Sequence, residues 1–162
     1  MKIWIAVLFI LIANTAFANV IKWNEDNINW LSYEKGLQIA EQEKKPILLV
    51  FYANWCGASK RYGKVFYDDE VVNLSKKFIM IKVDVNEDED EDLSLEYGVR
   101  YIPMTLFLDS KSNIQTDIRS RSSEHLFNLN EENPNELLRL MKKVQYKLNE
   151  VPIKPKVILM NH

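Results

Sequence analysis

The sequence has little cysteine and histidine, and each shortage excludes a class of site. Its 162 residues include one cysteine and two histidines. A single cysteine excludes an intrachain disulfide, and the isolated His125 and His162 lack the spacing of zinc ligands. With 21 basic and 23 acidic residues the net charge is −2, without the basic excess of a nucleic-acid-binding domain. We therefore expect no metal, no cofactor and no nucleic-acid partner.

The longest apolar run lies at the start of the chain. Lys2 precedes the apolar stretch Ile3–Ala13, and Ala16–Ala18 provides the small residues of a cleavage site. This pattern is typical of a secretory signal peptide over residues 1–18. An uncleaved membrane anchor is the alternative, but a spanning helix needs about 20 apolar residues. We expect an exported protein, periplasmic or secreted and free of the membrane after cleavage. Residence in the endoplasmic reticulum is disfavoured, because the chain ends without a retention motif.

Periodicity and turn signals predict alternating helices and strands after this leader. Asn29 is a candidate cap for a helix over 30–44, and Ile47–Ala53 is apolar throughout, like a strand covered on both faces. The other predicted elements are a helix over 58–66, a helix over 70–77 capped by Asp68 or Asp69, a strand over 78–84, a solvated acidic loop over 84–92, a helical turn over 93–97 ending at Gly98, a strand over 104–108, its hairpin partner over 114–118, and a last helix capped by Asn133.

The order of these elements predicts an α/β fold with a central mixed sheet and helices on both faces. A helical crossover makes the first two strands parallel, and the hairpin over 104–118 adds an antiparallel pair. We expect one domain over residues 19–150. Residues 151–162 contain two prolines without periodicity and are expected to form an extended tail.

Cys56 follows the apolar strand and precedes a predicted helix. A thiol at a helix N-terminus lies near free backbone N–H groups and the positive end of the helix dipole, which favour the thiolate. Lys60 and Arg61 add positive charge nearby. The position predicts a redox or nucleophilic thiol, with an inert buried thiol as the alternative. An odd cysteine in an exported chain also predicts intermolecular pairing, such as a dimer linked through Cys56.

Three segments resemble the thioredoxin superfamily in their order and spacing. They are Phe51–Lys60 with Trp55-Cys56-Gly57 at its centre, the strand Phe78–Val85, and Tyr101–Asp109 with Ile102-Pro103. Within the superfamily the chain is most similar to the anterior-gradient branch, by Trp30, Tyr33–Leu37, Lys45–Ile47 and Lys64–Phe66. The resemblance extends over residues 24–148 and implies a thioredoxin-like fold.

The resemblance also implies the parts of a site. Cys56 would attack a disulfide, Ser59 stands where dithiol members have the resolving cysteine, and Val50 stands where thioredoxins have a buried aspartate. A hydroxyl can donate a hydrogen bond to the thiolate, but it cannot displace a mixed disulfide, so both resolving parts are missing together. Pro103 would be a cis-proline facing Cys56, leaving the Ile102 backbone free to pair with an extended client chain.

The main hypothesis is an exported monothiol protein that exchanges or isomerises disulfides of client proteins. Cys56 and Ser59 would be the catalytic residues, and the client would contact Trp55, Gly57, Ile102 and Pro103. Glutathione is a second candidate partner, through a mixed disulfide. The alternative is a non-catalytic, chaperone-like module that forms occasional mixed disulfides. A scaffold that binds its partner without thiol chemistry is a third interpretation, so enzymatic turnover is left open.

Overall fold

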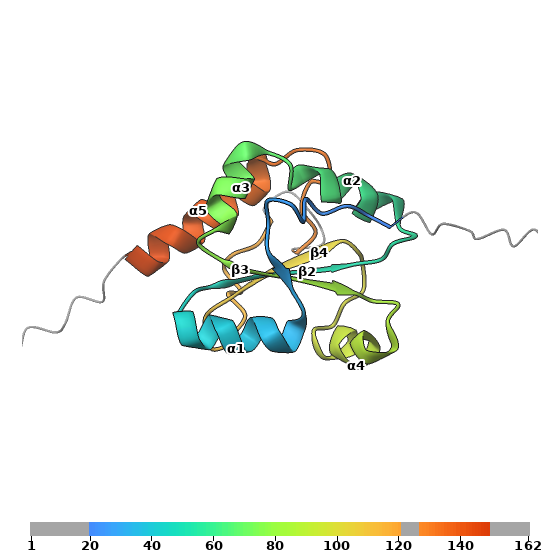
Figure 1. Cartoon of the computed structure of the whole chain (residues 1–162), viewed down its shortest axis with the longest axis horizontal. Coiled ribbons are helices and arrows are strands. Elements are labelled where there is room, and N and C mark those ends of the chain that lie inside the picture. The colour runs from blue at the N-terminus through green and yellow to red at the C-terminus, as the bar shows by residue number, and fades with distance from the viewer. Residues whose placement is uncertain (1–19, 121–126, 150–162) are drawn as a thin grey trace, which may run out of the picture.

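The computed structural model describes residues 20–120 and 127–149 (Figure 1). The expected leader over 1–18, the tail over 151–162 and both histidines, His125 and His162, lie outside the described residues. The predictions on these segments, and the domain bounds 19–150, therefore stay predictions. Within the described part, every helix is too short or too polar to cross a membrane.

Four strands form one mixed sheet between two layers of helices (Figure 1). The strands are β1 (Trp30–Leu31), β2 (Ile47–Tyr52), β3 (Ile79–Asp84) and β4 (Met104–Leu108), and the helices are α1 (Tyr33–Glu43), α2 (Gly57–Val65), α3 (Asp69–Ser75), α4 (Asp88–Glu96) and α5 (Asn135–Asn149). In the strand order β1-β3-β2-β4, the first three are parallel and β4 is antiparallel to β2. One face is covered by α1 and α4, the other by α2, α3 and α5. The predicted α/β class is confirmed.

The central strand β2 sets the position of the loops that follow it. All its side chains are buried, as its unbroken apolar sequence predicts. Its register aligns Tyr52 with Asp84 of β3 and Phe51 with Met104 of β4. Because β4 runs the opposite way, its first residue pairs with Phe51 near the end of β2, which in turn pairs with the end of β3. Three loops therefore meet at this edge of the sheet.

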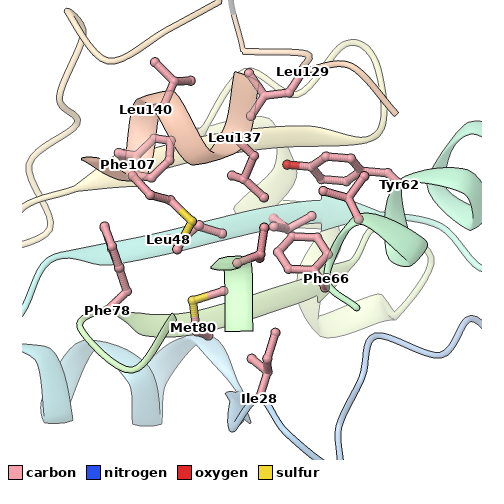
Figure 2. Packing of buried hydrophobic residues seen from close by; sticks show 14 of the residues in the cluster. Ile28, Leu48, Tyr62, Phe66, Phe78, Met80, Phe107, Leu129, Leu137 and Leu140 are labelled. Atoms are coloured by element: carbon pink, nitrogen blue, oxygen red, sulfur yellow. The ribbon is translucent and has the colours of Figure 1, made fainter. Parts of the chain in front are cut away.

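Apolar side chains fill the space between the sheet and each layer of helices. Figure 2 shows the face under α5, where Leu48 and Met80 from the sheet share a cluster with Phe66, Leu137 and other buried residues. Burying each such side chain contributes about 1.5–3 kcal/mol to the free energy of unfolding. This core fixes α2, and with it the start of the helix after Cys56.

The first predicted helix begins later than expected. Trp30 and Leu31 form β1, which pairs with β3, so Asn29 is not a helix cap and α1 begins at Tyr33. The Trp30 indole donates a hydrogen bond to the Trp23 carbonyl at 2.7 Å. Strand pairing and this hydrogen bond outweigh the helical periodicity of the sequence, as tertiary contacts often do.

The predicted acidic loop is wrong, because most of it forms α4. Its acidic residues occupy the N-terminal half of the helix, where the helix dipole favours negative charge. The helix is followed, as predicted, by Gly98, whose φ of 62° favours glycine. The predicted strand over 114–118 is also wrong. Ile114 makes one isolated bridge to Leu108, and Ile118 is buried in the core.

Two predicted helix starts are confirmed by their caps. The carboxylate of Asp68 accepts hydrogen bonds from the N–H groups of Glu70 and Val71 at the start of α3. The Asn133 side chain accepts one from the Asn135 N–H at 2.9 Å at the start of α5. Both are the short polar side chains that satisfy free N–H groups at helix starts.

Candidate functional site

Cys56 lies at the start of α2, in the loop after β2. Its N–H donates to the Ala53 carbonyl at 3.0 Å, and its carbonyl accepts from the Lys60 N–H at 3.0 Å. The first bond turns the chain out of the strand, and the second begins the helix. The thiol is half-buried and is the free cysteine of the described residues. It therefore occupies the helix N-cap position that the sequence predicted.

The loop before β4 brings Ile102 to this thiol. Cys56 Sγ lies 3.7 Å from the Ile102 carbonyl oxygen, although the two residues are 46 positions apart in the sequence. The peptide bond between Ile102 and Pro103 is cis, as the family resemblance implied. Antiparallel pairing of β2 and β4 produces this contact, because it places the end of one strand beside the start of the other. Two of the three segments that carry the family resemblance are thus adjacent.

Ser59 lies inside the protein, one turn after Cys56. The side chain is fully buried, and its hydroxyl oxygen accepts a weak hydrogen bond from the Ala53 N–H at 3.5 Å. This contact ties α2 to the loop after β2. A hydrogen bond from Ser59 to the Cys56 thiolate stays a prediction.

The sheet beneath the site is apolar at Val50. This buried residue aligns with Thr105 on β4, whose hydroxyl shares a 2.8 Å hydrogen bond with the Tyr62 hydroxyl of α2. Burial raises the pKa of Tyr62 well above its usual range, and the bond to Thr105 only partly opposes this. The side chains around Val50 therefore include two neutral hydroxyl groups.

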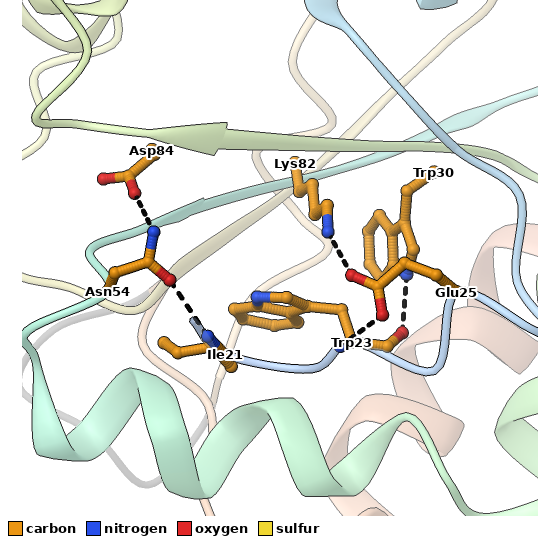
Figure 3. A network of polar contacts seen from close by, with 7 residues as sticks. All are labelled: Ile21, Trp23, Glu25, Trp30, Asn54, Lys82 and Asp84. Carbon is orange, nitrogen blue, oxygen red and sulfur yellow. Dashed lines mark hydrogen bonds and ion pairs between the residues drawn. The ribbon is translucent and has the colours of Figure 1, made fainter. Parts of the chain in front are cut away.

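On β3, the other neighbour of β2, Lys82 aligns with Val50. The Lys82 ammonium forms an ion pair with Glu25 from the N-terminal segment (Figure 3). The Lys82 ammonium also lies 6.0 Å from the centre of the Trp30 ring, within reach of a cation–π interaction. Partial burial raises the pKa of Glu25, but hydrogen bonds from Lys82 and the Trp23 N–H outweigh this and hold the pKa below its usual value. The lysine is thus paired at the surface of the protein.

A continuous chain of hydrogen bonds fixes the residue before the thiol. The Ile21 N–H donates to Asn54 Oδ1 at 3.0 Å, and Asn54 Nδ2 donates to the Asp84 carboxylate at 2.6 Å (Figure 3). Asp84 also accepts from Asn86 Nδ2 at 2.8 Å, and Asn86 Oδ1 accepts from the Trp55 indole at 2.8 Å. The Trp55 side chain is 70% exposed, so these bonds, rather than burial, hold it.

Sequence reasoning missed Asn54, Asp84 and Asn86 as parts of this network. A signal was present, because Asn54 and Asn86 each follow the carboxyl end of one of two neighbouring parallel strands, where functional loops gather. The sequence predicts Asp84 as the last residue of a strand, which is confirmed, and as the first of an acidic loop, without a hydrogen-bonding role. The structure shows it nearly buried, where a carboxylate needs hydrogen-bond donors.

The positive charge expected beside the thiol is partly neutralised. Arg61 forms an ion pair with Glu131 and a second with Glu132, whose carboxylate lies 3.5 Å from Arg61 Nε. These contacts join α2 to the segment before α5. Among the described residues, no group of three or more His, Cys, Asp and Glu side chains is placed to hold a metal ion.

Comparison with known proteins places this arrangement in a family. A family model described as thioredoxin-like matches residues 29–110, which include Cys56 and Pro103. Human anterior gradient protein 3 is 32% identical over 108 residues, covering 65% of this chain and 63% of that protein. Thiol:disulfide interchange protein DsbD from Vibrio vulnificus is 34% identical over 89 residues, covering 53% of this chain and 15% of that protein. A disulphide isomerase structure from Xylella fastidiosa matches with a TM-score of 0.55 at 26% identity, covering 69% of this chain and 87% of that one.

These relatives differ in how much of their length the chain matches. The chain spans less than two thirds of the length of the human relative and a small part of the Vibrio protein. Two of the three are named for thiol–disulfide chemistry.

Proposed function

This chain belongs to the thioredoxin-like family, and from that premise we propose that it exchanges disulfides with client proteins through Cys56. One observation carries the proposal: a half-buried thiol at the start of α2 lies 3.7 Å from the Ile102 carbonyl. A thiolate there can attack a disulfide while the Ile102 backbone pairs with the chain that bears it. Trp55, Gly57 and Pro103 complete the proposed contact with the client.

The exchange step needs no external oxidant or reductant. The Cys56 thiolate attacks one sulfur of a client disulfide, and a new S–S bond forms as the client's own S–S bond breaks. The electron pair leaves on the released client thiolate. A second client thiol then attacks the mixed disulfide and frees Cys56. The client is left with a rearranged disulfide, so the net reaction is isomerisation.

The neighbours of Cys56 favour this exchange over a dithiol cycle. Ser59 cannot displace the mixed disulfide, and Val50 offers no carboxylate to accept a proton. Release must then come from another thiol, on the client or on glutathione. In this proposal Ser59 acts only through its hydroxyl, as a hydrogen-bonding neighbour of the thiolate.

A non-catalytic, chaperone-like module is the second candidate function. Two large exposed side chains favour it: Trp55, one of the proposed contact residues, is 70% exposed, and Tyr101, next to Ile102 in the sequence, is 54% exposed. Exposed aromatic side chains are frequent anchors in protein interfaces. In this case Cys56 would form occasional mixed disulfides with a client, with glutathione or with a second copy of the chain.

Reactivation of a protein with scrambled disulfides, in a glutathione buffer, separates the two functions. We expect the wild type to accelerate reactivation and Cys56→Ser to abolish the effect, because a hydroxyl does not attack disulfides. Asn113→Ala is the matched control, since it keeps the thiol, truncates a side chain of the exposed turn after β4 and should retain the rate. If Cys56→Ser is as active as the wild type, disulfide exchange is refuted and the binding module is favoured. Intact mass measured without reductant reports any glutathione adduct or disulfide-linked dimer.

We also propose that the protein is exported and loses residues 1–18. An oxidising compartment would supply the client disulfides that the exchange requires. The protein recovered from a periplasmic extract or the culture medium should begin at Asn19, as measured by intact mass. A cytosolic product that retains the leader contradicts export.

A further inference from the structure

The outer edge of β4, opposite β2, is covered by segments that come later in the chain. The Gln115 N–H donates to the Phe107 carbonyl at 2.8 Å, and the Thr105 N–H donates to the Phe127 carbonyl at 2.8 Å. No regular strand of the described residues pairs with this edge. At the start of β4, which is the end of this strand nearest Cys56, the outer edge is therefore hydrogen-bonded to the segment around Phe127.

Asn128 extends this coverage from the strand to the loop before it. Its Nδ2 donates to the Pro103 carbonyl at 2.5 Å and lies 3.5 Å from the Tyr101 carbonyl. An amide nitrogen carries two hydrogens, so one side chain can serve both acceptors. These two carbonyls stand on either side of Ile102 in the sequence.

The Ile102 carbonyl has a different partner from the carbonyls of its two neighbours. It faces the Cys56 thiol at 3.7 Å, whereas the carbonyls of Tyr101 and Pro103 face Asn128. Residues 101–103 form a bend directly before β4. Because Asn128 holds the carbonyls on both sides of Ile102, it restricts rotation of the backbone that carries the Ile102 carbonyl.

Neighbouring residues anchor Asn128 in this position. Leu129 is buried in the core beneath α5, and Phe127 packs against the core beneath α1. The Thr105–Phe127 hydrogen bond adds a third attachment. The Asn128 amide is thus held on both sides in the sequence, which limits the entropy lost on making its two contacts.

We propose that Asn128 is a positioning residue for client recognition, which fixes the loop at residues 101–103 so that the Ile102 backbone faces both Cys56 and an incoming peptide. The inference rests on the proposed disulfide exchange and adds the residue that orients its docking segment. Asn128 does not touch the reacting sulfur atoms. Its loss should weaken reactions that need a docked chain and spare those that need only the thiol.

Two disulfides that release the same chromophore separate docking from thiol chemistry. One is a short extended peptide whose single cysteine is linked to thionitrobenzoate, and the other is the symmetrical disulfide of thionitrobenzoate. In both, Cys56 forms the new S–S bond and thionitrobenzoate leaves as its coloured thiolate. We expect Asn128→Ala to slow the peptide reaction about five- to tenfold, the effect of losing one well-placed hydrogen bond. The reaction with the small disulfide should change less than about twofold.

Asn113→Ala is the matched control, because Asn113 makes its hydrogen bonds within the exposed turn after β4. It should change neither rate. Equal slowing of both reactions by Asn128→Ala, or no slowing of either, overturns the proposal. The first outcome would mean that the variant damages the thiol environment as a whole.

A binding measurement keeps this test independent of thiol exchange. In the Cys56→Ser background, the same peptide with serine in place of cysteine should shift the amide NMR signal of Ile102 on titration. Asn128→Ala should weaken that binding about five- to tenfold. If the wild-type thiol exchanges with neither disulfide but this difference in binding persists, disulfide exchange fails and the positioning role stands. If the peptide does not bind, or binds both variants equally, the positioning role is refuted.

Discussion

Asn54→Ala should destabilise the protein and perturb the surroundings of Trp55, because Asn54 joins two segments of the hydrogen-bond network. Its Oδ1 accepts from the Ile21 N–H at 3.0 Å, and its Nδ2 donates to the Asp84 carboxylate at 2.6 Å. The substitution removes both contacts without adding bulk. It leaves the Asn86–Trp55 bond in place but removes one of the donors that position Asp84 beneath it.

The magnitude follows from the two bonds. A neutral hydrogen bond contributes about 1 kcal/mol to the free energy of unfolding, and one to a carboxylate contributes about 1.5–3 kcal/mol. Asp84 keeps two other donors, the side chain and the N–H of Asn86, at 2.8 and 3.2 Å. The Asp84 carboxylate therefore keeps hydrogen-bond donors in the variant. We expect the free energy of unfolding to fall by about 2 kcal/mol rather than by the full sum of the two bonds.

Urea unfolding followed by circular dichroism measures this loss. The Asn113→Ala variant again serves as the control, since it truncates an asparagine in an exposed turn and should cost under about 1 kcal/mol. The indole N–H signal of Trp55 in an NMR spectrum should shift or broaden in Asn54→Ala alone. A loss below about 0.5 kcal/mol with an unchanged Trp55 signal would refute the view that Asn54 joins the two segments.

Four further variants have expected outcomes. Ser59→Cys should create a dithiol that closes an internal disulfide on oxidation and reduces insulin, as shown by thiol titration and turbidity. Gly63→Ala should cost about 1–3 kcal/mol in urea unfolding, because a Cβ would lie 2.8 Å from Ile21 Cγ2 and 3.2 Å from the Lys22 carbonyl. Gly57→Ala should leave stability nearly unchanged, since its nearest contact would be 3.7 Å away, yet slow exchange with the peptide disulfide. Glu25→Gln should lower Tm at neutral pH, and this difference should shrink as the pH falls below the ordinary glutamate value of 4.5.

The sign of the last effect follows from the lowered pKa of Glu25. A carboxylate with a lower pKa in the folded state stabilises the fold above its unfolded pKa, and this is lost as the pH falls through the folded value. A constant Tm difference across that range would contradict the ion pair with Lys82. A Ser59→Cys protein that does not reduce insulin would contradict the expected dithiol. Equal free energies of unfolding for Gly63→Ala and Gly57→Ala would contradict the close packing of Gly63.

The sequence was sufficient for the fold class and for the location of Cys56. Interactions between residues close in the sequence decide these features. Examples are the unbroken apolar run of β2 and the helix caps Asp68 and Asn133. The prediction was wrong where distant contacts decide. Trp30 becomes part of a strand because β3 is available to pair with it, and Ile118 leaves the expected hairpin to enter the core.

What the sequence determined by itself about the site is its chemistry: one thiol, no second sulfur to resolve it, and valine instead of a buried acid. These are properties of residue type, which no fold can change. Only the tertiary structure decided what faces that thiol. Antiparallel pairing of β2 and β4 brings Ile102 to within 3.7 Å of Cys56, and Asn128 meets the carbonyls on either side of Ile102. Such contacts join residues far apart in the chain, and they exist only once the sheet and its core have formed.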